Sequence, residues 1–183
     1  MSEQRFEVPG FQASGIASGI KEEGRKDLAL LYSEVPAKAA GVFTTNVFKA
    51  APVLLDMERI KSGSARAVIV NSGNANAATG EEGYQDAVKM ARFCAGALSI
   101  DEAQVLVAST GVIGRRLPID KVAGSVSRLV KGLSPAGIPE AAEAIMTTDR
   151  YPKIQYREGA VGGSDVCICG IAKGAGMIEP GMA

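Results

Sequence analysis

The sequence predicts an α+β protein built as a layered α/β sandwich, in which helices flank mixed sheets. Residues 65–70 are rich in β-branched side chains and predict a buried strand, which runs into a polar loop at 71–80 and then an amphipathic helix over about 83–98. The same order of strand, loop and helix recurs over 104–133. Because such a helix packs its apolar face onto the sheet, two successive units favour a layered build.

The first part of the chain predicts short strands. Residues 1–26 carry glycines in a polar background and indicate irregular or short-strand structure. Short apolar runs at 27–32, 40–43 and 51–55 are bounded by turn residues, so each is expected to be a strand of one sheet. Between the last two runs lies Thr44-Thr45-Asn46, which predicts a turn cap or, alternatively, the wall of a pocket.

The second part of the chain combines strands and helices. Strand 104–108 is expected to end in a loop at 109–114, and apolar residues at three- and four-residue steps predict a helix over 119–133. The remaining predicted elements are a helix over about 139–146, a glycine-rich turn at 160–163 and a strand over 165–172. The loop at 71–80 has two interpretations, because loops at strand ends are common ligand sites and Asn and Gly also fill loops for conformational reasons.

Length and composition indicate a soluble globular protein. The chain has 183 residues, of which 46% are hydrophobic and 22% charged. No repeat, low-complexity tract or linker divides it, so residues 1–183 are predicted to form a single domain. Lysine plus arginine equals aspartate plus glutamate at 20 each, with no basic cluster, which argues against nucleic acid or an anionic membrane as a partner. A small-molecule substrate is therefore expected.

The chain also shows no membrane or export signal. No apolar run approaches the roughly 20 residues that a membrane-spanning helix needs, and the residues that follow Met1 lack the charged-then-apolar order of a signal peptide. The cytoplasm is the expected location.

Histidine and cysteine usage narrows the chemistry. The chain has no histidine, which removes the usual general base, the usual metal ligand and any Ser-His-Asp site. Of the three cysteines, Cys94 stands alone, and Cys167 and Cys169 are spaced by two in a predicted strand, so they share one face. Such a pair is a poor metal clamp. We expect no metal site, and we interpret the cysteines as buried small hydrophobic residues.

Ser109-Thr110-Gly111 is a candidate oxyanion site. A glycine amide at a strand end next to a short hydroxyl can supply two donors to a developing negative charge. A helix-capping or turn-forming Thr-Gly is the simpler alternative. A phosphate-binding loop is disfavoured, because residues 109–114 lack the Gly-Lys-Ser/Thr ending of one.

Lys173 is a second candidate. It lies between a predicted buried strand and the glycine-rich segment Gly174-Ala175-Gly176, where the backbone can hold its ammonium group toward a substrate carboxylate. A solvated lysine after a strand is the alternative.

The segment 173–183 is small, apolar and punctuated by glycines, which is unusual for a chain end. We interpret it as a cut end, although an ordinary C-terminal coil would also explain it. Without histidine, acyl transfer needs an N-terminal Thr, Ser or Cys, whose own α-amine, with a pKa of about 7.7–8.0, serves as the base. Such a residue arises by cleavage, and the upstream product of that cleavage would lack a nucleophile, as this chain does.

Taken together, the motifs resemble those of a known family. In their order along the chain they match the ornithine acetyltransferases, or bifunctional glutamate N-acetyltransferases, of arginine biosynthesis. The matching segments are Phe43-Thr44-Thr45-Asn46, Asn71–Ala77, Ser109–Gly114, Ile145–Asp149 and Lys173–Ile178.

The resemblance implies an α chain with an N-terminal-nucleophile-like build that a second chain completes. It implies cleavage between Ala183 and a following Thr that heads a β chain, and an α2β2 heterotetramer of the two chains. By motif, the oxyanion hole falls on the Thr110 hydroxyl and the Gly111 amide, and the substrate contacts in this half of the protein fall on Thr147 and Lys173.

The resemblance also implies a cycle without a cofactor. The N-terminal Thr of the β chain takes the acetyl group from N-acetylornithine, releases ornithine and passes the acetyl group to glutamate. Use of acetyl-CoA as a further donor stays open, because family members with and without it share these motifs. An N-terminal-nucleophile aminopeptidase-like hydrolase and a non-enzymatic small-molecule-binding domain are the alternatives.

Overall fold

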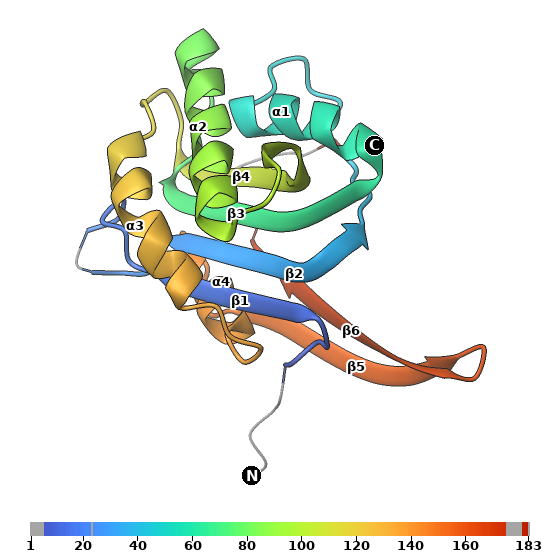
Figure 1. Cartoon of the computed structure of the whole chain (residues 1–183). Coiled ribbons are helices and arrows are strands. Elements are labelled where there is room, and N and C mark those ends of the chain that lie inside the picture. Colours follow the sequence, from blue (N-terminus) through green and yellow to red (C-terminus); the bar gives the residue numbers. More distant parts are fainter. Residues whose placement is uncertain (1–5, 23, 175–180, 183) are drawn as a thin grey trace.

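The computed structural model describes residues 6–22, 24–174 and 181–182 of the chain. At its centre is a four-stranded mixed sheet with the strand order β1-β2-β3-β4 (Figure 1). The first two pairs are antiparallel and β3 pairs with β4 in parallel. The strands are β1 (Phe11–Ile16), β2 (Leu28–Lys38), β3 (Ser64–Asn74) and β4 (Val105–Val112).

Three helices, α1 (Ala51–Arg59), α2 (Gly80–Leu98) and α3 (Ile119–Lys131), cover one face of the sheet (Figure 1). Helix α2 is the crossover between the parallel strands β3 and β4, as a parallel pair requires. Single 3₁₀ turns lie at Ile60–Ser62 and Glu102–Gln104. The alternation of side chains along each strand divides the sheet residues between this core and the opposite face. Fully buried members of this core include Leu28, Leu30, Ile69, Met90, Val105, Val107, Val122 and Leu129.

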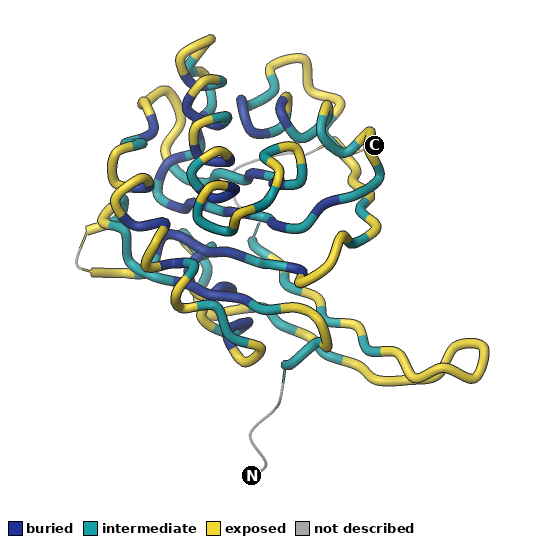
Figure 2. Tube along the Cα trace, viewed as in Figure 1, coloured by how far each residue is buried: buried dark blue, intermediate teal, exposed yellow. Residues whose placement is uncertain are grey.

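The opposite face is covered by helix α4 (Ile138–Ala144) and by the base of a hairpin formed by β5 (Lys153–Val161) and β6 (Ser164–Ala172). Ile154 and Ile171 of the hairpin join this second core. Beyond its base the hairpin extends away from the sheet, and its tip is exposed (Figure 2). A strand pair without a layer over its distal part leaves apolar side chains in water, as at Val161 and Ile168.

The predicted fold class is confirmed: the chain is an α+β structure with a mixed sheet and helices on both faces. Both predicted strand-loop-helix units are present. Their helices, predicted over about 83–98 and 119–133, correspond to α2 and α3, and the predicted helix after residue 138 is α4.

The predicted strand at 51–55 is wrong, because these residues form the start of α1. Pro52 lies in the first turn of the helix, where its missing N–H and fixed φ fit, and Ala51 and Leu55, one turn apart, face the core. A short apolar run does not by itself distinguish a strand from a buried helix face. The predicted strand at 40–43 is also absent, and its most apolar residue, Val42, is exposed.

The cysteine prediction is only partly right. Cys94 on α2 is fully buried, and burial raises the pKa of its thiol to about 12. Cys167 and Cys169 are only half-buried, because the hairpin that carries them projects from the body of the protein. In the described part of the chain, no helix is long and apolar enough to cross a membrane.

Asp56 on α1 provides a test of this packing. Its Oδ1 accepts a hydrogen bond from the Val107 N–H at 3.0 Å, and burial raises the pKa of its carboxyl to about 6. Because the raised pKa means that ionisation costs folding free energy, Asp56 lowers stability as the pH rises from about 4 to 6. Asp56→Asn keeps an acceptor without the charge, so it should raise the free energy of unfolding by on the order of 2 kcal/mol at pH 8 and by little at pH 4.

The measurement is thermal unfolding at both pH values. Glu58→Gln is the control, because Glu58 is exposed on the same helix, and it should change stability by less than about 0.5 kcal/mol. A change for Asp56→Asn that is equal at pH 4 and pH 8 would contradict the assignment.

Candidate active site

The ends of β3 and β4 place the two proposed oxyanion donors. The sequence predicts that residues 109–114 form a loop, but parallel pairing continues to the end of both strands, with Ser72 opposite Thr110 and Gly73 opposite Gly111. Thr110 is half-buried. Among the described residues, the Thr110 hydroxyl forms no hydrogen bond.

Gly111 is required where the two strands come together. Its φ is +136°, a region that side chains rarely adopt, and a Cβ there would lie 2.3 Å from the carbonyl carbon of Gly73. The backbones of β3 and β4 can approach this closely only because residue 111 is a glycine.

The asparagines at the end of β3 and just after it bond within the protein itself, and the predicted loop at 71–80 begins only after Asn74, because residues 71–74 still belong to the strand. Asn71 Nδ2 donates to the Asn74 carbonyl at 2.8 Å, and Asn71 Oδ1 accepts from Ser109 Oγ at 2.6 Å. Asn74 accepts from the Asn76 N–H at 2.8 Å, and Asn76 in turn donates to the Gly83 carbonyl. All three asparagines are buried. Of the two interpretations of this segment, the structure therefore favours the conformational one, in which these side chains fix the strand ends.

The loop that carries Thr147 is anchored just before that residue. Ser72 Oγ donates to the carbonyl of Ala144, the last residue of α4. The Lys21 ammonium donates to the Met146 carbonyl at 2.5 Å, and the backbone of Lys21 is itself held by the buried carboxylate of Asp27 at 2.8 Å. Ser72, which pairs with Thr110 across the two strands, therefore also anchors the end of α4 just before the Thr147 loop.

Asp149 joins Thr147 to Lys173. Its side chain is 1% exposed. Its Oδ2 accepts from the Thr147 N–H at 3.3 Å and lies 3.7 Å from Lys173 Nζ, while its Oδ1 accepts from the Gly174 N–H at 2.6 Å and from Lys153 Nζ at 2.6 Å. The hydrogen bond from Lys153 is the main reason that the pKa of Asp149 lies well below its usual range. Residues far apart in the sequence therefore meet at one carboxylate.

Lys173 is not the solvated lysine of the simpler interpretation. Its side chain is 24% exposed, and its ammonium donates to the Gly174 carbonyl at 3.1 Å. Burial is the main cause of the lowered pKa of Lys21, and the nearby charge of Lys173 adds to it. Lys21 contacts the Met146 carbonyl and Lys173 lies near Asp149, so two partly buried cations lie close to the Thr147 loop, a setting that favours an anionic group such as a carboxylate.

The segment Thr44-Thr45-Asn46 forms the predicted turn and makes a further contact. Thr44 Oγ1 accepts from the Asn46 N–H at 3.1 Å, and Asn46 Oδ1 accepts from the Phe48 N–H at 2.8 Å, which are side-chain turn caps. Thr45 also donates from its N–H and its hydroxyl to the Gly181 carbonyl, at 2.8 and 3.0 Å. Ala183, the predicted cleavage site, lies outside the described residues.

Sequence reasoning missed the residues that connect the site. Asp149 is part of the motif Ile145–Asp149, so its place in the sequence was a usable signal, but nothing in the sequence linked it to Gly174. Lys21 and Ser72 carried no such signal, because the carbonyls through which they hold this loop, those of Met146 and Ala144, are more than seventy residues away in the sequence.

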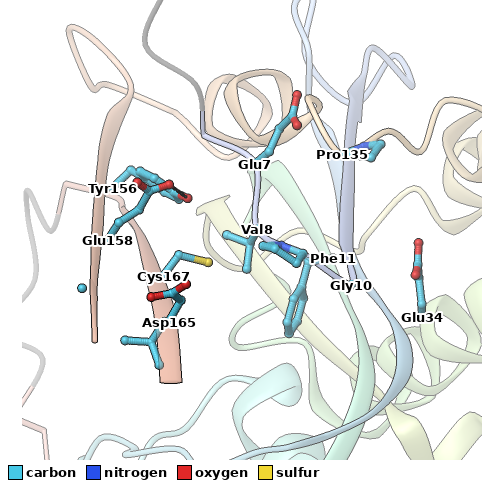
Figure 3. A pocket seen from close by; sticks show the side chains of 13 residues that line it. Glu7, Val8, Gly10, Phe11, Glu34, Pro135, Tyr156, Glu158, Asp165 and Cys167 are labelled. Atoms are coloured by element: carbon cyan, nitrogen blue, oxygen red, sulfur yellow. Dashed lines mark hydrogen bonds between the residues drawn. The ribbon is translucent and has the colours of Figure 1, made fainter. Parts of the chain in front are cut away.

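A separate cleft of about 820 Å³ lies between the start of β1 and the β5–β6 hairpin. Figure 3 shows Tyr156, Glu158 and Cys167 on the hairpin side, facing Val8 and Phe11. Tyr156 donates to Glu158 at 2.8 Å, a hydrogen bond that raises the pKa of Tyr156. None of the four proposed site residues lines this cleft, and its several carboxylates are unsuited to an anionic ligand. We therefore do not assign it as the active site.

In the ranges that the structure describes, no group of three or more histidine, cysteine, aspartate or glutamate side chains is arranged to hold a metal ion. The site is instead made of backbone amides, a hydroxyl and ammonium groups. The protein thus belongs to the class of α+β proteins in which helices cover both faces of a mixed sheet, and its candidate site residues are polar groups and a lysine.

The sequence model of the ArgJ family matches residues 12–183, and the chain belongs to this family. It is 53% identical over 176 residues to the arginine biosynthesis bifunctional protein ArgJ of Geobacter sulfurreducens, covering 96% of this chain and 45% of that protein. It is also 53% identical over 180 residues to the protein of the same name from Caldanaerobacter subterraneus subsp. tengcongensis, covering 98% and 44%. The chain therefore spans a little under half the length of these relatives.

Solved structures agree with this assignment. The crystal structure of the arginine biosynthesis bifunctional protein argJ from Bacillus halodurans has a TM-score of 0.92 at 41% identity, over 100% of this chain and 96% of that one. Ornithine acetyltransferase complexed with ornithine from Mycobacterium tuberculosis has a TM-score of 0.92 at 44% identity, over 100% and 98%. The family resemblance expected from the motifs is confirmed.

Gly111→Ala tests the close approach of the strand ends. The added methyl group would meet the Gly73 backbone and also require an unfavourable φ, so we expect a loss of about 3 kcal/mol or more of unfolding free energy. Gly124→Ala on α3 is the matched control, because nothing lies within 4 Å of the added Cβ, and it should stabilise the helix by about 0.5–1 kcal/mol. Thermal or denaturant unfolding compares the two. Equal and small effects would show that β3 and β4 do not approach as described.

Proposed function

We propose that the protein is an acetyltransferase of arginine biosynthesis that moves an acetyl group from N-acetylornithine to glutamate. The observation that carries the proposal is the meeting of Thr147 and Lys173 at the Asp149 carboxylate, within a fold whose adjacent strand ends present Thr110 and Gly111. Membership of the ArgJ family supports the same activity, and so does the similarity to an ornithine acetyltransferase complexed with ornithine.

A second chain would supply the nucleophile. The chain spans 44–45% of two relatives from other bacteria but 96–98% of the matched chains in solved structures, which supports a protein made of two chains. In this proposal the precursor cleaves itself after Ala183, and the new N-terminal Thr heads a β chain that completes an N-terminal-nucleophile build. The two chains assemble as an α2β2 heterotetramer.

The first half-reaction forms an acetyl-enzyme. The Thr hydroxyl attacks the acetyl carbonyl of N-acetylornithine, and its proton passes to the free α-amine of the same Thr. The carbonyl oxygen becomes negative in the tetrahedral intermediate, where the Thr110 hydroxyl and the Gly111 amide donate to it. The bond from the carbonyl carbon to the amide nitrogen then breaks, and the departing nitrogen takes the proton, which releases ornithine.

The second half-reaction reverses these steps with glutamate. Its amine attacks the ester carbonyl, the same donors hold the oxyanion, and the Thr oxygen leaves with a proton to regenerate the enzyme. N-acetylornithine and glutamate each carry an α-carboxylate. Lys173 and the Thr147 loop bind that carboxylate in both half-reactions, which holds the reacting carbon near the donors.

The decisive assay uses the protein expressed from its full-length precursor. Purified protein should transfer the acetyl group from N-acetylornithine to glutamate, and sequencing of a co-purifying chain should begin at Thr. Release of free acetate without an acceptor would favour the hydrolase alternative. Absence of a second chain and of turnover would favour a non-enzymatic binding domain. Omission or addition of acetyl-CoA decides whether it is a further donor.

Thr110→Ala tests the oxyanion role. Removal of one donor should lower kcat by roughly 10²–10³ with a smaller change in KM, because this hydrogen bond strengthens only as charge develops. Thr110→Ser keeps the hydroxyl and should retain much of the rate. A gel must first establish that each variant is fully cleaved, since the same donors serve the cleavage step. A cleaved Thr110→Ala enzyme with the wild-type rate would exclude the role.

Lys173→Ala tests carboxylate binding. Loss of the charge-assisted hydrogen bond should lower kcat/KM by one to two orders of magnitude, which corresponds to roughly 1.5–3 kcal/mol. Lys131→Ala is a suitable control, because Lys131 is exposed at the end of α3, and it should retain the wild-type kcat/KM. Steady-state kinetics with both substrates provides the comparison. Wild-type kinetics in a processed Lys173→Ala enzyme would show that Lys173 does not bind the substrate carboxylate.

A further inference from the structure

We propose that Asp149 is a positioning residue, whose carboxylate fixes Thr147 and Lys173 in the geometry that binds the substrate carboxylate. The inference rests on the proposed function, and it assigns the residue on which substrate affinity at that site depends. Asp149 itself need not touch the substrate, because its oxygens are occupied by protein donors.

Burial of the ionised Asp149 side chain would cost folding free energy if these donors were absent. An ionised carboxylate that is 1% exposed loses most of its hydration, and such a charge persists only when it is paired and hydrogen-bonded. Two backbone N–H groups and two lysines surround it. The hydrogen bond from Lys153 first, and the two backbone amides after it, hold the pKa of Asp149 far below the range in which an enzyme works. The carboxylate is therefore a permanent charge of the site.

The backbone donors come from the two segments that carry the proposed ligands. One donor is the N–H of Thr147 itself, at 3.3 Å, and the other is that of Gly174, the neighbour of Lys173, at 2.6 Å. The first segment is the loop after α4, and the second is the chain that leaves β6. Among the residues that the structure describes, Asp149 is the side chain that accepts from both segments. Their relative position therefore depends on it.

The two lysines divide their roles around this carboxylate. Lys153 makes the close ion pair at 2.6 Å, whereas Lys173 Nζ stays 3.7 Å away and donates one hydrogen bond, to the Gly174 carbonyl, within the described part of the chain. An ammonium group has three donors. Because Lys153 balances most of the charge of Asp149, Lys173 is oriented by the carboxylate without being neutralised by it. Its remaining donors stay available for a substrate carboxylate.

Gly174 provides a second way to reach the same contact. A Cβ at this position would lie 2.8 Å from Asp149 Oδ1, closer than such atoms approach in proteins. A methyl group there must displace the carboxylate or the Gly174 backbone. Gly174→Ala should therefore disturb the site from the opposite side without changing its charge.

The experiment compares Asp149→Asn and Gly174→Ala in the processed two-chain protein. Each should raise the KM for both N-acetylornithine and glutamate by about tenfold to a hundredfold while kcat changes by less than about threefold, since the oxyanion donors on β4 are untouched. The control is Asp86→Asn, because Asp86 is also buried and ion-paired, with Arg116 at 2.8 Å, but contacts none of these residues. It should lower the Tm and leave both KM values unchanged.

Hydrogen exchange supplies a readout that does not require turnover. The amides of Thr147 and Gly174 should exchange at least tenfold faster in Asp149→Asn than in the wild-type protein or in Asp86→Asn. Wild-type KM values in processed Asp149→Asn would overturn the inference, and so would unchanged exchange at both amides. The proposed function fails if the wild-type protein transfers no acetyl group. In that case hydrogen exchange still tests the positioning role, and unchanged exchange at both amides would overturn it.

Discussion

The close approach of β3 and β4 at their last residues is the constraint on which the rest of the site depends. Parallel pairing up to Gly73 and Gly111 depends on the absence of a side chain at Gly111, because a Cβ there would overlap the Gly73 backbone. The approach sets the direction of Thr110. It also sets that of Ser72, whose hydroxyl holds the end of α4 and hence the start of the Thr147 loop.

Much of the fold could be predicted from side-chain periodicity, because α2 and α3 bury one face against the sheet and show it in their sequences. The error at α1 has the same origin, since an apolar run as short as 51–55 fits either a strand or a helix face. The hairpin was only half predicted. Only the start of β5, at Ile154 and Tyr156, alternates apolar with polar residues, which is too short a signal for a strand of this length, and the rest of β5 is defined by its pairing with β6.

The site was predictable as motifs but not as geometry. Thr110 and Gly111 are adjacent in sequence, so the role proposed for them needs no tertiary information, whereas Thr147 and Lys173 both contact Asp149 only in the folded chain. The asparagine-rich segment at the end of β3 illustrates the opposite case. Its polar composition suggested a ligand loop, yet Asn71 belongs to the strand, and its buried side chain donates to the Asn74 carbonyl, because buried backbone groups need hydrogen-bond partners.

Two means of preorganisation coexist in this chain, and they suit different tasks. The proposed oxyanion donors lie at the end of β4, whose backbone pairs with β3 up to that point, and a developing charge in a transition state requires donors that are held in place. The proposed carboxylate-binding residues lie in loops, where the Asp149 carboxylate accepts three hydrogen bonds and forms a longer ion pair with Lys173 at 3.7 Å. In the proposed cycle, a loop held by one ionic centre suits the binding of two different substrates in turn, whereas the oxyanion donors must stay fixed, because both proposed half-reactions pass through an oxyanion at the same place.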